Sequence, residues 1–220
     1  MGCGKEVLFP GFHPIPTAWA IPNSDLKIPQ YPAVAVDRVR YVGDPIAVVV
    51  AETPFQASDA AEMIYVEYVP LEPVIDQEKA VEKGAPQLYD EVPGNIAFRW
   101  KIDAGNVDEV FSKADVVVKE RFVNQRLQPA SMETRGTVAS FDQGTGETTV
   151  WMTSQNPHVH RFLLSLILGV PENRLRVIAP DVGGGFGSKI SCYGPEAVVC
   201  YLSKHTVYFT THRFHIVLTW

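Results

Sequence analysis

The chain lacks the features that mark membrane proteins and nucleic-acid-binding proteins. No apolar run reaches the roughly 18 residues that a membrane helix needs, and no cluster of Lys and Arg offsets the net charge of -6. A surface of that charge repels a phosphate backbone. No charged and then apolar leader opens the sequence. We therefore expect no signal peptide, no membrane span and no nucleic-acid partner.

Cysteine is also scarce. Cys3, Cys192 and Cys200 are odd in number and form no Cys-x-x-Cys pair. This pattern predicts neither a zinc site nor a disulfide framework, and it favours a reducing, cytoplasmic setting. Cys200 lies in the apolar run 197–202, which predicts a buried thiol that packs as a small hydrophobic side chain.

What remains is the composition of a soluble globular chain. Hydrophobic residues make up 46% of the 220 residues and charged residues 20%, enough for one large or two small domains. Proline density and apolar patterning predict five segments in order: an extended Pro-rich segment at 1–32, a first α/β unit at 33–75, a linker at 76–100, a second unit at 101–204, and an atypical tail at 205–220.

The first unit carries a clear helix start. Thr53 is placed to cap the helix, Pro54 to occupy its first turn, and Gln56 to close a capping box. Apolar residues at 39–42, 46–51 and 65–69 predict strands, the second of them covered on both faces because its apolar positions are consecutive.

The second unit shows further helix and strand signals. Asn106 is placed to cap a short helix with Glu109 in its first turn, and residues 116–123 read as a strand. Runs at 136–141 and 148–153 predict a hairpin, and 175–179 a buried strand. Between them, Asn156 caps a predicted helix that ends at Gly169 and buries a stripe of apolar side chains: Val159, Phe162, Leu163, Leu166 and Ile167.

A glycine-rich loop, Val-Gly-Gly-Gly-Phe-Gly-Ser-Lys at 182–189, follows the last strand. Its bare main chain can approach a ligand closely, and we expect Phe186 to wall a cavity or to lock the loop onto the core. Ser188 separates the last glycine from Lys189, which breaks the P-loop motif, and the dinucleotide fingerprint fails at the same serine. A tight structural turn is the alternative interpretation.

Four stretches now stand in order: 40–51, 129–134, Ser-Gln-Asn-Pro-His at 154–158, and the glycine loop. This order resembles the molybdenum-binding large subunit of the xanthine dehydrogenase, aldehyde oxidase and aerobic carbon monoxide dehydrogenase family, from about residue 16 to 204. The resemblance implies an α+β fold, in which 33–75 is a remnant of the α/β-hammerhead domain and 101–204 the first part of a molybdopterin-binding domain.

The resemblance also implies a site. Gln155 would lie beside the oxo ligand of the metal, Phe186 would border the substrate pocket, and both would act in catalysis. The cofactor-binding residues would be Gln155, Gly183, Gly184, Gly185, Phe186 and Gly187, with no protein ligand to the metal. The cofactor would be molybdenum–molybdopterin in its cytosine dinucleotide form. Partner subunits would hold iron–sulfur clusters and FAD.

Some of these residues have a plainer interpretation. Gln155 could be a residue at a helix start that bonds only the backbone. His158 and His160 fall in the first helical turn, where solvent exposure or local capping is expected rather than metal ligation. Glu133 is expected to be a structural carboxylate bonded to backbone amides, with a catalytic base as the alternative.

Ile190 stands where purine-oxidising members have a glutamate, which favours the carbon monoxide dehydrogenase-like and aldehyde-oxidising branch. The family's subunit is several times longer and the tail leaves its pattern, so a frame shift or a truncation is one explanation. We predict a fragment of an oxidoreductase, a molybdenum hydroxylase large subunit that oxidises a small carbonyl-type substrate with oxygen from water and is inactive alone. The alternative is a non-catalytic module that assembles flavin or iron–sulfur subunits. The failed phosphate motifs disfavour a nucleotide-binding module.

Overall fold

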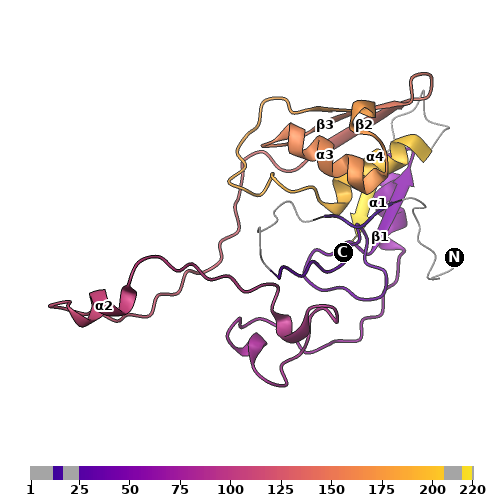
Figure 1. The fold of residues 1–220 in the computed structure, drawn as a ribbon. Helices are drawn as coiled ribbons and strands as arrows, with labels where there is room; N and C mark the ends of the chain where they lie inside the picture. Colours follow the sequence, from indigo (N-terminus) through magenta and orange to yellow (C-terminus); the bar gives the residue numbers. More distant parts are fainter. Residues whose placement is uncertain (1–11, 17–24, 206–214, 220) are drawn as a thin grey trace.

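The computed structural model describes residues 12–16, 25–205 and 215–219. It contains α-helices and two small β-sheets, which confirms the predicted α+β class. Figure 1 shows a body in which helices pack against the sheets, and a long arm, residues 101–128, that carries α2 (Val107–Ser112) away from it. No helix within the described residues is long and apolar enough to cross a membrane.

The first sheet has two antiparallel strands, β1 (Ala47–Ala51) and β5 (His215–Thr219). Helix α1 (Pro54–Glu62) lies beside it and begins with the predicted capping box. Gln56 N–H donates to Thr53 Oγ1 at 3.2 Å, and Thr53 N–H donates to Gln56 Oε1 at 3.1 Å. Such a cap stabilises a helix by about 1 kcal/mol. β1 itself is half-buried along its length, not covered on both faces as predicted.

Three of the predicted strands do not form. Residues 39–42, 65–69 and 116–123 have an irregular backbone, although their apolar residues suit a pleated sheet. A strand needs a neighbour for its backbone hydrogen bonds, and the register pairs none of these segments with another strand of the described residues. Val116 and Phe122 are consequently 77% and 89% exposed.

The second sheet has the order β2-β3-β4. The hairpin of β2 (Thr137–Asp142) and β3 (Glu147–Met152) is confirmed, and β4 (Leu175–Ile178) pairs parallel to β3. Parallel neighbours need a crossover connection, which α3 (Pro157–Leu168) and a short 3-10 turn, η3 (Glu172–Arg174), provide. The segments that follow β3 and β4 therefore leave the same edge of the sheet.

Helix α3 begins and ends where predicted but is rotated about its axis relative to the predicted stripe. Gly169 ends it in the left-handed conformation at φ 61°, whereas the Asn156 side chain makes no cap. The buried residues are His160, Leu163, Leu164 and Ile167. Of the predicted stripe, three are substantially exposed: Val159 (37%), Phe162 (48%) and Leu166 (46%).

The main core lies between α3, α4 (Gly194–His205) and the second sheet. Residues from two places in the N-terminal part of the chain enter this core, one in the Pro-rich segment and one at the start of the first α/β unit. Ile15 and Ala33 are 7% and 4% exposed, and the carbonyl oxygen of Ala33 lies so close to Gly194 that a Cβ there would sit 2.2 Å from it. As predicted, Cys200 is buried, at 2% exposure. Cys3 lies outside the described residues.

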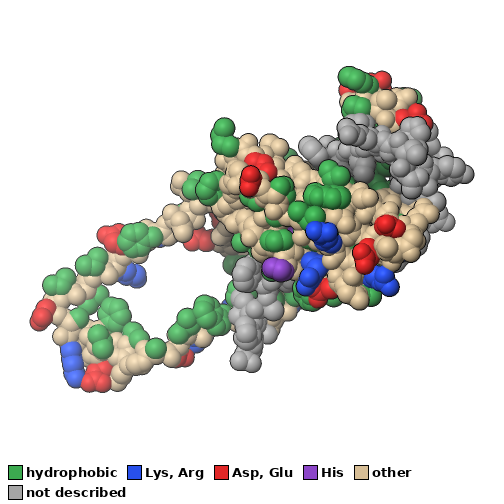
Figure 2. All heavy atoms as spheres, turned by 90° about the horizontal axis from the view of Figure 1, so that it is seen from above, with side chains coloured by type: hydrophobic (Ala, Val, Ile, Leu, Met, Phe, Trp, Pro, Cys, Tyr) green, Lys and Arg blue, Asp and Glu red, His purple; other side chains and the backbone are tan. Residues whose placement is uncertain are grey.

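The arm and the segment before it contain little regular structure. Two 3-10 turns, η1 (Lys79–Val81) and η2 (Pro93–Asn95), precede the arm. The Asn106 cap of α2 is confirmed, because Asn106 Oδ1 accepts from Glu109 N–H at 3.4 Å. Figure 2 shows hydrophobic side chains along the projecting arm, where Val118 is 77% exposed and Leu127 80% exposed.

Candidate cofactor site

The segments after β3 and β4 meet, as their parallel register requires. Gln155 lies in the turn between β3 and α3, and the glycine loop follows β4. Gln155 Oε1 accepts from the N–H of Gly187 at 3.0 Å and from that of Lys189 at 3.2 Å. Gln155 N–H donates to the Lys189 carbonyl at 3.1 Å. The structure therefore brings together the glutamine and the glycine loop that the sequence analysis selected.

This geometry decides how Gln155 faces a ligand. Two main-chain N–H groups can only donate, so they require the carboxamide oxygen on their side. The NH2 end is left on the other side, and no hydrogen bond of the described residues uses it. Gln155 can therefore offer two donors to a bound group while its oxygen holds the loop.

Two of the loop glycines are required by packing within the chain. A Cβ on Gly185 would lie 2.4 Å from Gln155 Cδ, and one on Gly183 would lie 2.6 Å from Glu133 Cβ. Gly184 and Gly187 have φ of 97° and 88°, which L side chains rarely adopt. Only Gly187 of the four faces open space, with no atom within 4 Å of a Cβ built on it. Gly187 is thus the loop position with room for a ligand against bare main chain.

Of the two roles expected for Phe186, locking the loop onto the core is wrong. Its backbone has φ of 50°, uncommon for an aromatic residue, and its side chain is 72% exposed. The ring lies over Gly184, whose Cβ position is 3.2 Å from Phe186 Cε2. The ring is therefore presented outward, beside the bare main chain, where it can contact a bound molecule.

The loop carries hydrogen-bond donors without partners. Within the described residues, no hydrogen bond uses the N–H of Gly184, Gly185 or Phe186. Ser131 Oγ is buried without a partner, and it lies 3.5 Å from the Cβ position of Gly184. Native proteins seldom leave buried polar groups unpaired, so each such group needs an explanation. These donors suit a bound group rich in anionic or oxygen acceptors.

Lys189 and Glu133 secure the two ends of the loop. Lys189 is buried, with 1% of its surface exposed, and its Nζ donates to Glu133 Oε2 at 2.8 Å and to the Glu133 carbonyl at 2.9 Å. Glu133 Oε2 also accepts from Gly183 N–H at 2.9 Å. These bonds lower the pKa of Glu133, and the bond from Lys189 has the largest effect. Glu133 thus bonds a backbone amide, as the structural interpretation predicts.

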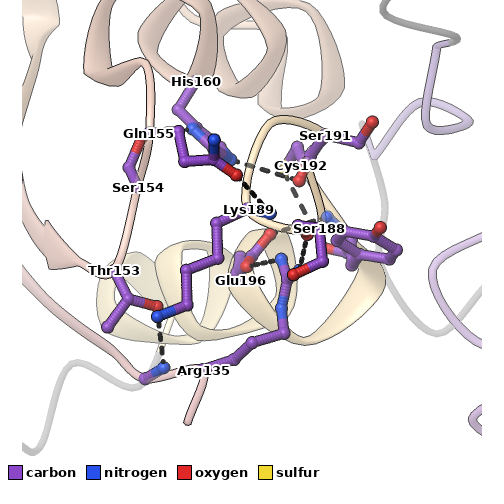
Figure 3. A network of polar contacts seen from close by, with 12 residues as sticks. Arg135, Thr153, Ser154, Gln155, His160, Ser188, Lys189, Ser191, Cys192 and Glu196 are labelled. Atoms are coloured by element: carbon purple, nitrogen blue, oxygen red, sulfur yellow. Dashed lines mark hydrogen bonds and ion pairs between the residues drawn. The ribbon is translucent and has the colours of Figure 1, made fainter. Parts of the chain in front are cut away.

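A second ion pair lies beneath the end of the loop (Figure 3). Arg135 donates to the Ser188 carbonyl, pairs with Glu196 on α4, and stacks over the Tyr193 ring at 3.9 Å. Glu196 also accepts from Tyr193 N–H at 2.7 Å. Sequence reasoning missed Arg135, Lys189 and Glu196 as parts of the site. The one signal in the sequence for any of these residues is the position of Lys189, directly before the apolar Ile190.

Of the two alternatives expected for His160, solvent exposure or local capping, solvent exposure is wrong. It is fully buried on α3, where Nδ1 lies 2.7 Å from Ser154 Oγ and Nε2 lies 3.2 Å from the Ser191 carbonyl oxygen. Burial lowers its pKa, and the charge of Glu196 opposes that shift. His158 is exposed, as predicted. In the described part of the chain, no three His, Cys, Asp or Glu residues gather as a metal site.

Comparison with known families matches residues 88–214 to the molybdopterin cofactor-binding domain. Residues 5–72 match the a/b hammerhead domain of aldehyde oxidase and xanthine dehydrogenase. The molybdopterin-binding match begins before residue 101 and ends after residue 204, so it is longer than the predicted second unit. The boundaries of the five segments stay predictions. The order of the two matched domains agrees with the predicted fold.

Individual relatives agree with these families. The carbon monoxide dehydrogenase large chain of Afipia carboxidovorans is 41% identical over 173 residues, which cover 73% of this chain and 21% of that protein. The nicotine 6-hydroxylase large subunit of Paenarthrobacter nicotinovorans is 40% identical over 174 residues, 79% of this chain and 21% of that protein. The chain thus spans about a fifth of the length of these relatives.

Among solved structures, quinoline 2-oxidoreductase from Pseudomonas putida 86 superposes with a TM-score of 0.77 and 32% identity, covering 89% of this chain and 24% of that one. Carbon monoxide dehydrogenase from Oligotropha carboxidovorans superposes with a TM-score of 0.63 and 38% identity, covering 70% of this chain and 21% of that one. The chain belongs to the molybdopterin-binding large-subunit family of xanthine dehydrogenase, aldehyde oxidase and carbon monoxide dehydrogenase.

Proposed function

We propose that this chain is part of the large subunit of a molybdenum hydroxylase, and that Gln155 and the glycine loop form one wall of the cofactor site. The observation that carries the proposal is the convergence of Gln155 with Gly187, where bare main chain faces open space. Unpaired donors lie along the same loop, and the unpaired Ser131 Oγ lies beside Gly184. A bound molybdenum–pterin would supply the oxidation of the substrate with oxygen from water.

The chain's own groups would bind and orient. The Gln155 NH2 would donate to an oxygen of the cofactor without adding a charge near the metal. The loop N–H groups would approach the cofactor where no side chain intervenes, and Phe186 would border the substrate. The cytosine dinucleotide form of the pterin, and partner subunits that carry iron–sulfur clusters and FAD, are part of the same proposal.

For the substrate we propose a small carbonyl-type molecule, carbon monoxide or an aldehyde. The support is the apolar Ile190 at the position where the family resemblance places a glutamate in purine oxidisers. We propose that the chain alone is inactive, because it spans about a fifth of its relatives. Turnover of carbon monoxide, an aldehyde and xanthine by the assembled complex tests this choice, and preference for xanthine overturns it.

The cofactor site is tested by metal and pterin analysis of the chain, coexpressed with its partner subunits. Gln155→Ala and Phe186→Ala should lower the molybdenum and pterin content per chain. His158→Ala, an exposed change in the adjoining helix turn, is the matched control and should leave it unchanged. Equal content in all four proteins would refute the proposal.

A second candidate function is a non-catalytic assembly module. The observation in its favour is the apolar arm, whose Val116, Phe122 and Leu127 are each at least 77% exposed. Apolar surface of this kind marks interaction sites. Capture of the flavin or iron–sulfur subunits by a chain that carries no molybdenum supports this function, and Phe122→Ser should abolish the capture. Capture that requires molybdenum argues against it.

A further inference from the structure

Lys189 is an unusual residue to find beneath the glycine loop. It is the largest of the fully buried side chains in the described residues, and a buried charge is tolerated only when it is paired and hydrogen-bonded. A methionine would fill a similar volume without that cost. Its presence therefore needs a role beyond filling space.

Lys189 is connected to the start of the loop through Glu133. Its ammonium binds the Glu133 carboxylate and carbonyl, and the same carboxylate oxygen accepts from Gly183 N–H. Glu133 N–H donates to the Gly183 carbonyl at 3.1 Å. The start of the loop at Gly183 and its end at Lys189 are thus attached to Glu133. Between these ends, the N–H groups of Gly184, Gly185 and Phe186 bond to no other group of the described chain.

Lys189 also connects this pair to Gln155. Its main-chain N–H donates to Gln155 Oε1, and its carbonyl accepts from Gln155 N–H. We infer that Lys189 and Glu133 are positioning residues, which fix the glycine loop and, through the Lys189 backbone, the direction of the Gln155 carboxamide before any ligand binds. This inference rests on the proposed function only in taking Gln155 and the loop as the cofactor wall.

The amide of Gly187 reports the inference directly. Among the residues that the structure describes, Gly187 N–H bonds only to Gln155 Oε1, and it has no bond to the side chain of Lys189 or Glu133. If the ion pair of Lys189 and Glu133 only holds Gly183 against Glu133, removing the pair leaves the protection of the Gly187 amide unchanged. If the pair positions Gln155, the Gly187 amide loses protection as well.

The experiment is amide hydrogen exchange by NMR on the full chain. Lys189→Met should lower protection at Gly183, Gly187 and Lys189 by about tenfold or more, the range expected when bonds of this kind open locally. The α3 amides should keep theirs. The matched control is Arg161→Met, which breaks an exposed ion pair with Glu172 away from the loop and should change none of the loop amides.

Two further arms keep the test decisive. Glu133→Gln alone leaves the Lys189 ammonium buried without a charged partner, so it should lower amide protection in the loop more than the double variant Glu133→Gln with Lys189→Met. If the effects of the two single changes on protection simply add in the double variant, the two residues are not coupled and the inference is overturned. In wild type, acidification through the lowered pKa of Glu133 should loosen Gly183 and Gly187 together. Lys189 is the charged group that faces Glu133. This arm needs no variant to fold.

The outcome separates the two proposals. Loosened Gly187 in Lys189→Met supports the positioning role whether or not the chain ever carries molybdenum. Unchanged Gly187 in a folded Lys189→Met overturns it, even if the wild-type complex is fully loaded with cofactor. Molybdenum and pterin content of the coexpressed variant, measured against Arg161→Met, should fall with the protection of Gly187.

Discussion

Gly185→Ala should displace Gln155 from the glycine loop. The new methyl group would lie 2.4 Å from Gln155 Cδ and 2.5 Å from Oε1, too close for any real contact. Gln155 is exposed, so its side chain can swing into solvent and relieve the overlap. The swing breaks the bonds from Gly187 and Lys189 to Oε1. At about 1 kcal/mol for each bond, local opening at Lys189 should become easier by about 2 kcal/mol, roughly thirtyfold in amide exchange.

The assay is exchange of the Lys189 amide in Gly185→Ala, with Gly187→Ala as the control. Alanine at 187 meets no atom within 4 Å, so its cost is the backbone strain of φ 88°, about 1–2 kcal/mol. The control should leave Gln155 in place and the Lys189 amide protected. If the Lys189 amide in Gly185→Ala exchanges as slowly as in wild type, Gln155 does not occupy the position described, and the prediction is wrong.

Three further outcomes follow from packing and burial. Leu164→Ala in the core should lower the unfolding free energy in urea by about 2–5 kcal/mol, whereas Leu166→Ala at 46% exposure should cost far less; equal losses would contradict the burial of α3. Burial lowers the pKa of His160 from its ordinary 6.5, so the stability that neutral His160 contributes is present above that pH and is lost as pH falls through it. His160→Gln should flatten this dependence in urea titrations, and a slope identical to wild type would refute it. Burial raises the pKa of Cys200 to about 12 and that of Cys192 well above its usual value, so both thiols should resist iodoacetamide until urea unfolds the chain; fast native labelling at either would be inconsistent.

Local signals were read correctly where the chain completes them by itself. The Thr53 cap needs only Gln56, three residues away, and the hairpin of β2 and β3 needs only its own turn. Residues 116–123 have the same strand pattern but no neighbouring strand in the described residues, so the pattern does not become structure. Periodicity also placed the α3 stripe one position off, because a histidine at 160 fills a core position through its bonds to Ser154 and Ser191.

The site was predictable in part for the same reason. The glycines form a visible pattern, the family resemblance singles out Gln155, and the parallel register of β3 and β4 brings the two together. The supporting groups form no pattern. Lys189 and Glu133 are 56 residues apart and Arg135 and Glu196 are 61 apart, so only the fold reveals that they pair. Which glycines serve packing and which faces open space likewise depends on atoms elsewhere in the chain.

The most direct test of the central claim is a structure of the molybdenum-loaded complex that contains this chain. We expect the pterin and its metal against the bare main chain at Gly187, with the Gln155 NH2 donating to the cofactor and the Gln155 oxygen still bonded to the loop. A cofactor bound on another face of the domain, or a Gln155 whose oxygen points to the cofactor, would contradict it.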